Sequence, residues 1–313
     1  MNKYKNKIAI TTGDVNGIGA EITIKALNFL NLPEDSVVLI TNQKIIDFYG
    51  KLNTPYEIIN IDFKGSIEPS KICAESGEFS YNSLKKACEI NPKAIVTAPV
   101  AKEAMHLAGH KFNGQTEVLE NFLAHDNQKA EMLFVADNFR VLLLTRHIPL
   151  KDVSKNISED LIQKKVLIVK DFLNKYLKKE NPHFALCSIN PHAGENGIIG
   201  NEEKDILIPA CEKLRNMGIN ITNPLPADTL FIKAGQNYIK NLPQQYDCYF
   251  AIYHDQGLIP IKTVAPNETV NMTIGLDTIR TSPCHGTAFD IAGQNKADFS
   301  SMISAIKTAL KYA

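Results

Sequence analysis

Three histidines stand where strand-like apolar runs end, and together they indicate a metal site. The run LLLTRHIPL leads to His147, CSINPHAGENG to His192 and CYFAIYHDQGL to His254. Imidazole is a common ligand of zinc and similar divalent ions, and three protein ligands leave one position open at which the metal polarises a substrate oxygen. The histidines are 45 and 62 residues apart, so no local motif explains them. Taken singly, each is an ordinary loop histidine; as a set they favour a site at the edge where open α/β sheets bind ligands.

Residues that suit an anionic ligand gather in residues 261–293. Lys262, Asn271 and Arg280 supply two cationic groups and an amide, which fit a phosphorylated or carboxylated small molecule. Comparable polar stretches are TAPVAKEAM (97–105), FNGQTEVL (112–119) and PLPADTLF (224–231). Individually these residues are typical of solvated or capping positions, but near a metal they favour a binding site.

Short apolar runs alternate with longer helical patterns, and this alternation positions the polar residues. Strands are predicted at 7–11, 37–41, 94–99, 132–136, 140–145, 184–189, 248–253 and 270–275. Helices are predicted at 19–30, 80–90, 158–179, 202–217 and 299–312, with Pro209 expected to kink or shorten the fourth. The pattern is typical of βαβ units and predicts mostly parallel sheets covered on both faces.

The first predicted turn, TTGDVNGIGAEI, follows a strand and opens a helix. Gly13, Gly17 and Gly19 permit close backbone approach, and the helix start offers N–H groups to an anion. The glycine spacing is not GxGxxG, and VVLITNQ lacks an acidic residue for a ribose hydroxyl, so a Rossmann fold is disfavoured. A tight packing turn explains the glycines equally well.

Composition sets the class of protein. A chain of 313 residues with 44% apolar content predicts two domains. Lys plus Arg and Asp plus Glu number 34 each, which gives no bulk charge for nucleic acid or an anionic membrane. The six scattered cysteines suit a reduced, cytoplasmic protein, and no apolar stretch approaches a signal peptide or a membrane span.

Motifs along almost the whole chain resemble those of one family. GDVNGIGAE resembles the GDPAGIGPE signature of the 4-hydroxythreonine-4-phosphate dehydrogenases of pyridoxal phosphate synthesis. The likeness continues through TAPVAK, GQTE, TRHIPLKDV, NPHAGENG, PLPADT, YHDQGLIPIK and NMTIGLDTIRTSPCHGTAFDIAG. The resemblance implies an oxidoreductase that uses NAD or NADP and one divalent metal ion (Zn, Mg or Co). It would oxidise 4-hydroxythreonine 4-phosphate and release carbon dioxide, giving 3-amino-2-oxopropyl phosphate.

The resemblance also assigns residues and architecture. The family's metal ligands fall on His147, His192 and His254, and its substrate contacts on Gln115, Thr116, Lys262, Asn271 and Arg280. The implied fold is two α/β/α domains with a cleft between them, similar to isocitrate and isopropylmalate dehydrogenases and not a Rossmann fold. We expect residues 1–128 plus 276–313 to form the first domain and 129–275 the second, which carries the metal histidines. The stretch HDNQKAE near 125–132 is the expected crossing point. The family further implies a homodimer with its active site at the subunit interface.

The chain departs from the family at one chemically important position. Gln115 stands where the family's GHTE motif has histidine; glutamine keeps a donor and an acceptor but cannot carry a proton. Val15 and Asn16 replace Pro and Ala in the opening signature, which is a milder change. Lys262 is the leading candidate for proton transfer, and Asp255 either acts instead or orients a ligand.

Three alternatives remain open at this point. A relative that oxidises threonate or erythronate phosphate would keep the metal site, a phosphate acyltransferase would need neither the histidines nor NAD, and a binding protein would be expected to lose ligands. His285 is close enough in sequence to Arg280 to support it, although an exposed loop histidine is the favoured interpretation; His106, His110, His125 and His183 are assigned to the surface or to loops. The native metal, the choice between NAD and NADP, and the residues that contact the nucleotide are left open.

Overall fold

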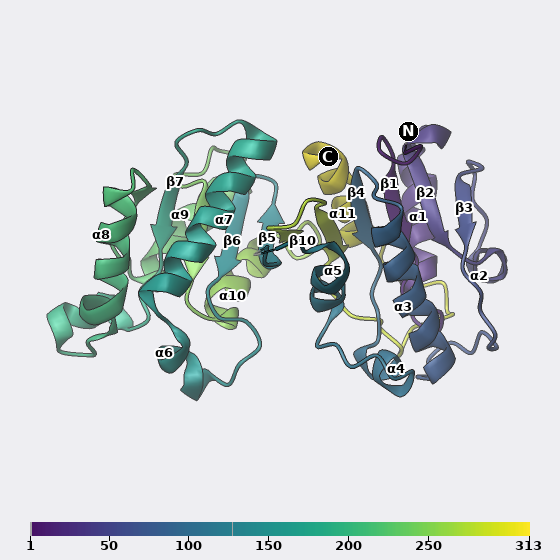
Figure 1. Cartoon of the computed structure of the whole chain (residues 1–313), viewed down its shortest axis with the longest axis horizontal. Helices are drawn as coiled ribbons and strands as arrows, with labels where there is room; N and C mark the ends of the chain where they lie inside the picture. Colours follow the sequence, from purple (N-terminus) through teal and green to yellow (C-terminus); the bar gives the residue numbers. More distant parts are fainter. Residues whose placement is uncertain (1, 127) are drawn as a thin grey trace. The chain divides into compact units, whose positions relative to one another are not determined.

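The computed structural model describes residues 2–126 and 128–313 and has the predicted α/β class. The chain forms two compact units, one of Met1–Ala130 with Val270–Ala313 and one of Glu131–Thr269. Figure 1 follows the chain through both. The strand at 270–274, which the sequence grouped with the second domain, belongs to the first unit because it pairs with the strand at 280–283. Part of the expected crossing stretch, Asn127, lies outside the described residues.

The first unit is built on a mostly parallel sheet. Its strands, in spatial order, are β3 (Glu57–Asn60), β2 (Val37–Thr41), β1 (Ile8–Thr11), β4 (Ala94–Thr97), β11 (Arg280–Pro283) and β10 (Val270–Ile274). All neighbours pair in parallel except β10 and β11. The central strands β1, β2 and β4 are buried along their whole length. Continuous apolar strands of this kind are expected where helices cover both faces of a sheet.

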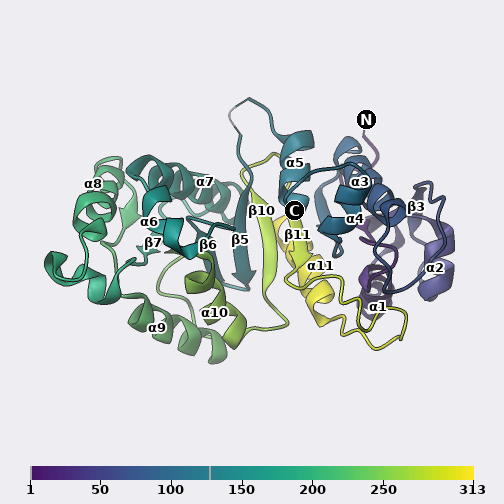
Figure 2. The same cartoon turned by 90° about the horizontal axis from the view of Figure 1, so that it is seen from below.

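Helices cover the two faces of that sheet. They are α1 (Gly19–Leu30), α2 (Gln43–Tyr49), α3 (Ala74–Glu89), α4 (Lys102–Leu107), α5 (Gln115–Leu123) and α11 (Ser300–Tyr312), with a 3₁₀ turn at Glu34–Ser36. The first helix packs against α11, whereas α3 packs against α4 and α5. Figure 2 shows these two groups on opposite sides of the strands.

The second unit repeats this architecture on a smaller sheet. Its strands, in spatial order, are β5 (Glu131–Ala136), β6 (Phe139–Leu143), β9 (Cys248–Ala251), β7 (His183–Leu186) and β8 (Asn220–Ile221). The β5–β6 hairpin is antiparallel, whereas β6 and β9, β9 and β7, and β7 and β8 pair in parallel. The helices are α6 (Val153–Asn156), α7 (Glu159–Leu177), α8 (Ile208–Asn216), α9 (Ala227–Ile239) and α10 (His254–Val264). A 3₁₀ turn occupies Leu150–Asp152, and a turn whose central residues have positive φ occupies Pro191–Gly197.

Pro209 acts close to the way the sequence predicts. A π-helical turn at Glu203–Leu207 gives way to α8 at Ile208, so the proline falls in the first turn of the new helix. Proline is tolerated there because the first turn has no intrahelical acceptor for its missing N–H. The predicted helix 202–217 is therefore two helical segments rather than one.

The glycine-rich turn after β1 is fixed by contacts within the first unit. Gly13 has φ +71°, and a Cβ there would lie 2.2 Å from the Pro99 carbonyl oxygen, so only glycine fits. Asp14 is fully buried; its carboxylate accepts from the Asn16 N–H at 2.9 Å and from the Ser76 hydroxyl at 3.3 Å. Burial raises the pKa of Asp14 to about 6. The turn is thus a tightly packed structural element, as one of the two sequence interpretations has it.

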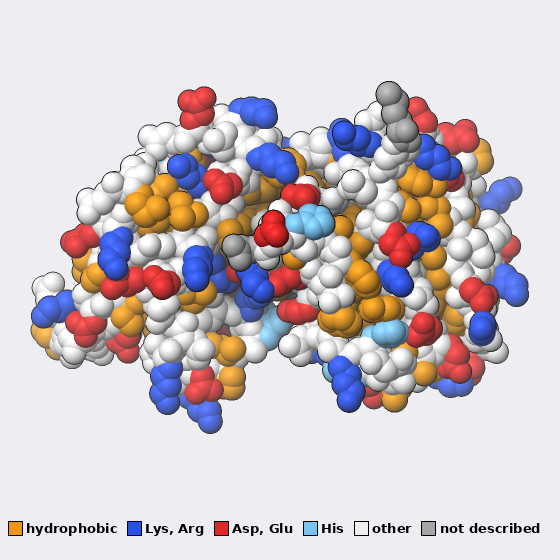
Figure 3. Space-filling model, in the orientation of Figure 1, with side chains coloured by type: hydrophobic (Ala, Val, Ile, Leu, Met, Phe, Trp, Pro, Cys, Tyr) orange, Lys and Arg blue, Asp and Glu red, His pale blue; other side chains and the backbone are white. Residues whose placement is uncertain are grey.

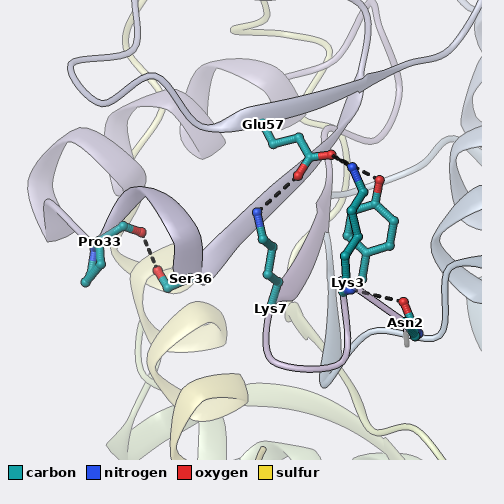
Figure 4. Close-up of polar contacts among 7 residues, drawn as sticks. Asn2, Lys3, Lys7, Pro33, Ser36 and Glu57 are labelled. Atoms are coloured by element: carbon teal, nitrogen blue, oxygen red, sulfur yellow. Dashed lines mark hydrogen bonds and ion pairs between the residues drawn. The ribbon is translucent and has the colours of Figure 1, made fainter.

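A second polar cluster fixes the N-terminal residues. Glu57 on β3 accepts from Lys3 at 2.7 Å, from Lys7 at 3.0 Å and from the Tyr4 hydroxyl at 3.0 Å (Figure 4). These contacts, first that of Lys3, lower the pKa of Glu57 to about 2.

The surface carries charges of both signs. Lysine, arginine and carboxylate side chains are interspersed over the face shown in Figure 3, in agreement with the equal totals of 34. Within residues 2–126 and 128–313, no helix has both the length and the apolar character needed to cross a membrane.

Candidate active-site residues

The three predicted metal histidines follow three adjacent strands of the second unit. His147 follows β6, His192 follows β7 and His254 opens α10 directly after β9. Strand β9 lies between β6 and β7 and pairs in parallel with both. The C-terminal ends of the three strands therefore meet at one edge of the sheet, which is where open α/β sheets bind ligands.

His147 and His254 form a close pair. Their ring centroids are 5.5 Å apart and their planes are inclined by 47°. Two imidazoles on one tetrahedral zinc ion, with zinc–nitrogen distances of about 2.0–2.1 Å, have centroids about 5 Å apart. The pair therefore fits a shared divalent ion.

His192 lies in the same group of loops but has a different immediate partner. Its Nδ1 is 2.7 Å from Oε1 of Glu195, and this hydrogen bond raises the pKa of His192. His254 likewise has its Nδ1 2.7 Å from Oδ1 of Asp255. A carboxylate on Nδ1 leaves Nε2 for a metal and is the usual support of a ligating histidine. In the described part of the chain, however, no three His, Cys, Asp or Glu side chains are grouped as ligands of one ion.

The two predicted proton-transfer residues lie at opposite ends of α10. Asp255, 70% exposed at its side chain, contacts His254, which is the orienting role that the sequence left open for it. Lys262 is in the last turn. Eight residues separate Lys262 from His254, a rise of about 12 Å along an ideal helix.

The other four predicted substrate residues lie in the first unit, and Arg280 is the most unusual of them. It is 3% exposed, and burial lowers its pKa to about 10. Its Nε and Nη2 donate to the hydroxyl of Thr97 at 2.8 and 2.5 Å. Within the described residues no carboxylate forms an ion pair with it. A buried cation without an anionic partner is costly, so the position favours an anionic ligand.

Asn271 lies on the same face of the sheet as Arg280. In the β10–β11 pair, Asn271 is opposite Ser282 and Thr273 is opposite Arg280. Directly opposed residues, and residues two apart on one strand, share a face. Asn271 Oδ1 and Thr273 Oγ1 are both buried and have no hydrogen-bond partner among the described residues. Most buried polar atoms in folded proteins have a partner, so these two atoms favour a polar ligand at this position.

Gln115 and Thr116 begin α5 beside the end of β4. Gln115 Nε2 donates to the Ala98 carbonyl at 3.2 Å, and Ala98 directly follows the residue that holds Arg280. A carbonyl only accepts, so this bond fixes the orientation of the amide and leaves Gln115 Oε1 as an acceptor. That oxygen is buried and has no hydrogen-bond partner in the described part of the chain. Thr116 is 5% exposed.

The remaining histidines show no grouping with these residues. His285 has its Nδ1 3.0 Å from the carbonyl oxygen of the adjacent Gly286. His110 stacks on Tyr81 at 3.6 Å and contacts Glu78. The surface assignment agrees with the exposed position of His106 on α4, but it is wrong for His183, which is half-buried as the first residue of β7.

Comparison with known proteins identifies the family. The family model described as "Pyridoxal phosphate biosynthetic protein PdxA" matches residues 7–309. The chain belongs to the PdxA family. It is 37% identical to a 4-hydroxythreonine-4-phosphate dehydrogenase of Sulfurihydrogenibium sp. (strain YO3AOP1), with 97% of each sequence covered. It is 36% identical to a D-threonate 4-phosphate dehydrogenase of Salmonella typhimurium, with 98% of each covered. The predicted family and the oxidoreductase class are thereby confirmed.

Solved structures place the PdxA-family chain in the expected fold. The 4-hydroxythreonine-4-phosphate dehydrogenase of Klebsiella pneumoniae aligns with a TM-score of 0.85 and 32% identity over 100% of this chain and 99% of that one. An isocitrate dehydrogenase from Methylococcus capsulatus aligns at 0.51 with 13% identity over 98% and 85%, which shows a shared fold alone. The predicted likeness to isocitrate dehydrogenases is confirmed at that level.

The sequence did not single out two polar residues that the structure makes prominent. Thr97 is the last residue of β4 and holds Arg280; Gln256 follows His254 by two positions and bridges two loops. Thr97 lies in the family-like motif TAPVAK and Gln256 in YHDQG, and in YHDQG the sequence drew attention to His254 and Asp255 instead. Their position at or shortly after the C-terminal end of a strand is the signal that could have identified them.

Proposed function

We propose that this PdxA-family protein oxidises 4-hydroxythreonine 4-phosphate with NAD or NADP and a divalent metal ion. Loss of carbon dioxide from the β-keto acid then gives 3-amino-2-oxopropyl phosphate. Family membership and the names of its relatives support the reaction class. The single observation that carries the proposal is Arg280, which is buried and, among the described residues, forms no ion pair with a carboxylate.

Arg280 is proposed to bind the phosphate or the carboxylate of the substrate. A guanidinium offers several N–H donors in one plane, and Thr97 takes up only the Nε and Nη2 contacts. An anion at the remaining donors would offset the desolvation of the charge. Thr116, buried at the start of α5, and Lys262 are proposed as further substrate contacts, as the family resemblance implies.

The metal is proposed to bind at His147, His192 and His254. A bound divalent ion supplies Lewis-acid stabilisation of negative charge on a substrate oxygen. Asp255 and Glu195 hold the Nδ1 atoms of His254 and His192 and so fix which nitrogen each ring presents. Lys262 and Asp255 both remain proposals for proton transfer, and the contact of Asp255 with His254 favours Lys262.

The unpartnered amide oxygens bear on which substrate is used. Gln115 Oε1 and Asn271 Oδ1 can accept hydrogen bonds from a ligand that carries donors, whereas a phosphate oxygen can only accept. An ammonium group brings three donors, and the hydroxyl that replaces it in threonate phosphate brings one. We therefore favour the aminated substrate. The D-threonate 4-phosphate dehydrogenases among the relatives make threonate phosphate the second candidate, and erythronate phosphate is the third.

A substrate panel tests this choice. Each of the three acid phosphates is offered with NAD and then NADP, and reduction of the nucleotide is followed by absorbance. We expect the highest kcat/KM with 4-hydroxythreonine 4-phosphate, and Gln115→His to change it by less than about tenfold, which is 1.4 kcal/mol. A clear preference for a substrate without the amine would overturn the substrate assignment. Removal of the metal by a chelator should abolish turnover, and added Zn²⁺, Mg²⁺ or Co²⁺ should identify the ion that restores it.

A homodimer with its active site at the subunit interface is also proposed. The loops that carry the histidines also carry exposed aliphatic side chains: Ile148 (36%), Leu150 (70%), Ile198 (83%) and Ile259 (64%). Exposed apolar groups beside a site are typical of a surface that is covered by a partner. If one active site joins the histidines of one subunit with Arg280 of the other, mixing inactive His254→Ala protein with weakly active Arg280→Met protein should restore part of the activity. A fully active monomer in light scattering would contradict the proposal.

A further inference from the structure

One glutamine side chain joins two of the histidine loops. Gln256 Nε2 donates to the Ser188 carbonyl at 2.7 Å, and its Oε1 accepts from the Ile252 N–H at 2.7 Å. A backbone carbonyl only accepts and an N–H only donates, so both ends of the amide have fixed roles. Gln256 therefore links the segment that leads from β9 to His254 with the segment that leads from β7 to His192.

The third loop contacts the same residue, Ile252. The Thr145 hydroxyl donates to the Ile252 carbonyl at 2.7 Å, and the Thr145 N–H donates to it at 3.0 Å. Thr145 is 5% exposed and precedes His147 by two residues. The Ile252 N–H is thus linked through Gln256 to the loop that leads to His192, and the Ile252 carbonyl is linked directly to Thr145 in the loop that leads to His147.

A buried carboxylate holds the loop that leads to His192. Glu203 is 3% exposed; its Oε1 accepts from the N–H groups of Ile189 and Asn190 at 2.9 and 2.8 Å. Its Oε2 accepts from the Asn190 side-chain amide at 2.9 Å. Hydrogen bonds to an ionised acceptor are stronger than neutral ones, so this contact is a firm anchor.

The backbone just beyond that anchor is strained. Residues 192–196 all have positive φ, and four of the five are not glycine: His192 at 52°, Ala193 at 56°, Glu195 at 43° and Asn196 at 59°. Left-handed conformations are unfavourable for residues with a Cβ and persist where the surroundings impose them. Glu203 also lines the inside of this turn, because a Cβ added at Gly194 would lie 2.8 Å from its Oε2.

We propose that Gln256 and Glu203 are positioning residues, which set the spacing of His147, His192 and His254 for metal binding. The proposal rests on the metal site proposed above. Neither side chain is assigned to the metal; each acts through the backbone that carries a histidine. Groups that orient metal ligands typically change metal affinity by about 10- to 100-fold when they are removed. A merely structural role would lower the stability of the fold and leave the affinity of the folded protein unchanged.

Another glutamine of the same unit provides a matched control. Gln244 Nε2 donates to the Ala234 carbonyl at 3.0 Å, and its Oε1 accepts from the Tyr249 hydroxyl at 3.0 Å. Like Gln256, it is half-buried and bridges two segments, but neither segment is a histidine loop. Gln256→Met and Gln244→Met remove equivalent pairs of hydrogen bonds.

The experiment titrates Co²⁺ into the whole metal-free protein and follows its visible absorption, which reports both affinity and ligand geometry. We expect Gln256→Met to weaken Co²⁺ binding by about 10- to 100-fold and to alter the spectrum. Gln244→Met should bind Co²⁺ with an affinity within about threefold of that of the original protein. Such a difference is small beside the effect expected for Gln256→Met. Equal affinities and spectra in the two variants would overturn the proposal. If the original protein binds no Co²⁺, or His254→Ala leaves binding intact, the metal site fails and this proposal fails with it.

Glu203→Gln decides the matter if Gln256→Met does not fold. Glutamine has nearly the same shape as glutamate, but one carboxylate oxygen becomes an NH₂ group, which would face the N–H donors that Glu203 now accepts from. We expect weaker Co²⁺ binding and, without any metal, faster hydrogen exchange at the amides of Ile189 and Asn190. Unchanged exchange and unchanged affinity would show that Glu203 does not hold the turn and would overturn its assignment.

Discussion

Replacing Arg280 by methionine should separate stability from function, with effects of opposite sign. Burial lowers the Arg280 pKa from 12.5 to about 10, a difference that corresponds to about 3 kcal/mol of unfavourable desolvation as an upper limit. Loss of the contacts with Thr97 removes about 1.5–3 kcal/mol of hydrogen bonding. Methionine fills most of the same space. We therefore expect the free energy of unfolding to stay level or to rise by as much as about 2 kcal/mol.

Activity should fall in the same variant. Loss of a charge-assisted contact with a phosphate or carboxylate corresponds to about 1.5–4 kcal/mol, or roughly 10- to 1,000-fold in kcat/KM. Urea unfolding measures the first quantity and steady-state kinetics the second. Inorganic phosphate should stabilise the original protein against urea and leave the variant unaffected.

A second buried arginine supplies the control. Arg140 in the other unit is 5% exposed and donates to the carbonyls of Asn138 and Asp247 at 3.2 and 3.4 Å. Arg140→Met should lower the free energy of unfolding and leave kcat/KM unchanged. If Arg280→Met instead destabilised the fold by more than about 2 kcal/mol and left the kinetics intact, Arg280 would be a structural residue and the reasoning would be refuted.

Three further predictions concern charges buried or paired in the fold. The pKa of Asp14 in the folded protein is about 6, which lies above its value in the unfolded chain. Its stabilising contribution is therefore complete below about pH 4 and is lost as the pH rises through 6. Relative to Asp14→Asn, the original protein should lose about 2–3 kcal/mol of unfolding free energy over that interval, measured by urea unfolding. Glu57 should show the opposite pH dependence, because its folded pKa of about 2 makes its stabilising contribution present above about pH 4 and lost as the pH falls through 2. Glu57→Gln should therefore lower the free energy of unfolding by about 1 kcal/mol at pH 7 and leave it unchanged near pH 2. A difference in unfolding free energy that stays constant with pH would contradict the assignment. Lys165 and Glu131 form a buried ion pair at 2.6 Å, with Lys165 also donating to a backbone carbonyl; Lys165→Met should cost about 3–5 kcal/mol in urea unfolding, and adding Glu131→Gln should recover most of it.

The sequence predicts the long, regular elements well because their patterns are local. The helix predicted at 19–30 is α1 residue for residue, and the strand predicted at 37–41 is β2. The helix predicted at 80–90 begins instead at Ala74, because its first turn, AESGEF, carries serine and glycine that are buried against neighbours rather than exposed. That burial depends on tertiary packing, which propensity alone does not reveal.

Several short elements escape prediction for the same reason. Strand β8 has two residues and β11 begins with the charged Arg280, so neither shows an apolar run. Helix α10 contains Pro260 and opens with polar residues, which disfavours a helix from sequence alone. In the site, the residue types of the histidines and Arg280 could be recognised, but the contact between Gln256 and Ser188 joins residues 68 apart in the sequence. It exists only because their strands are neighbours.

Strand order also explains why the three histidines are not equivalent. Along the chain they run 147, 192, 254, but in the sheet β9 lies between β6 and β7, so His254 is central. His147 follows the end of its strand by four residues and His254 by three, and these two form the observed pair.

His192 follows the end of β7 by six residues, and β7 is two places from β6 in the sheet. Strands in a sheet are about 4.8 Å apart, so His192 starts roughly 10 Å from the strand of His147. A longer loop is needed to cover that distance, and a longer loop is entropically looser. The left-handed turn at 192–196 and its anchor at Glu203 counter that looseness, which is why the strain is found in this loop and not in the other two.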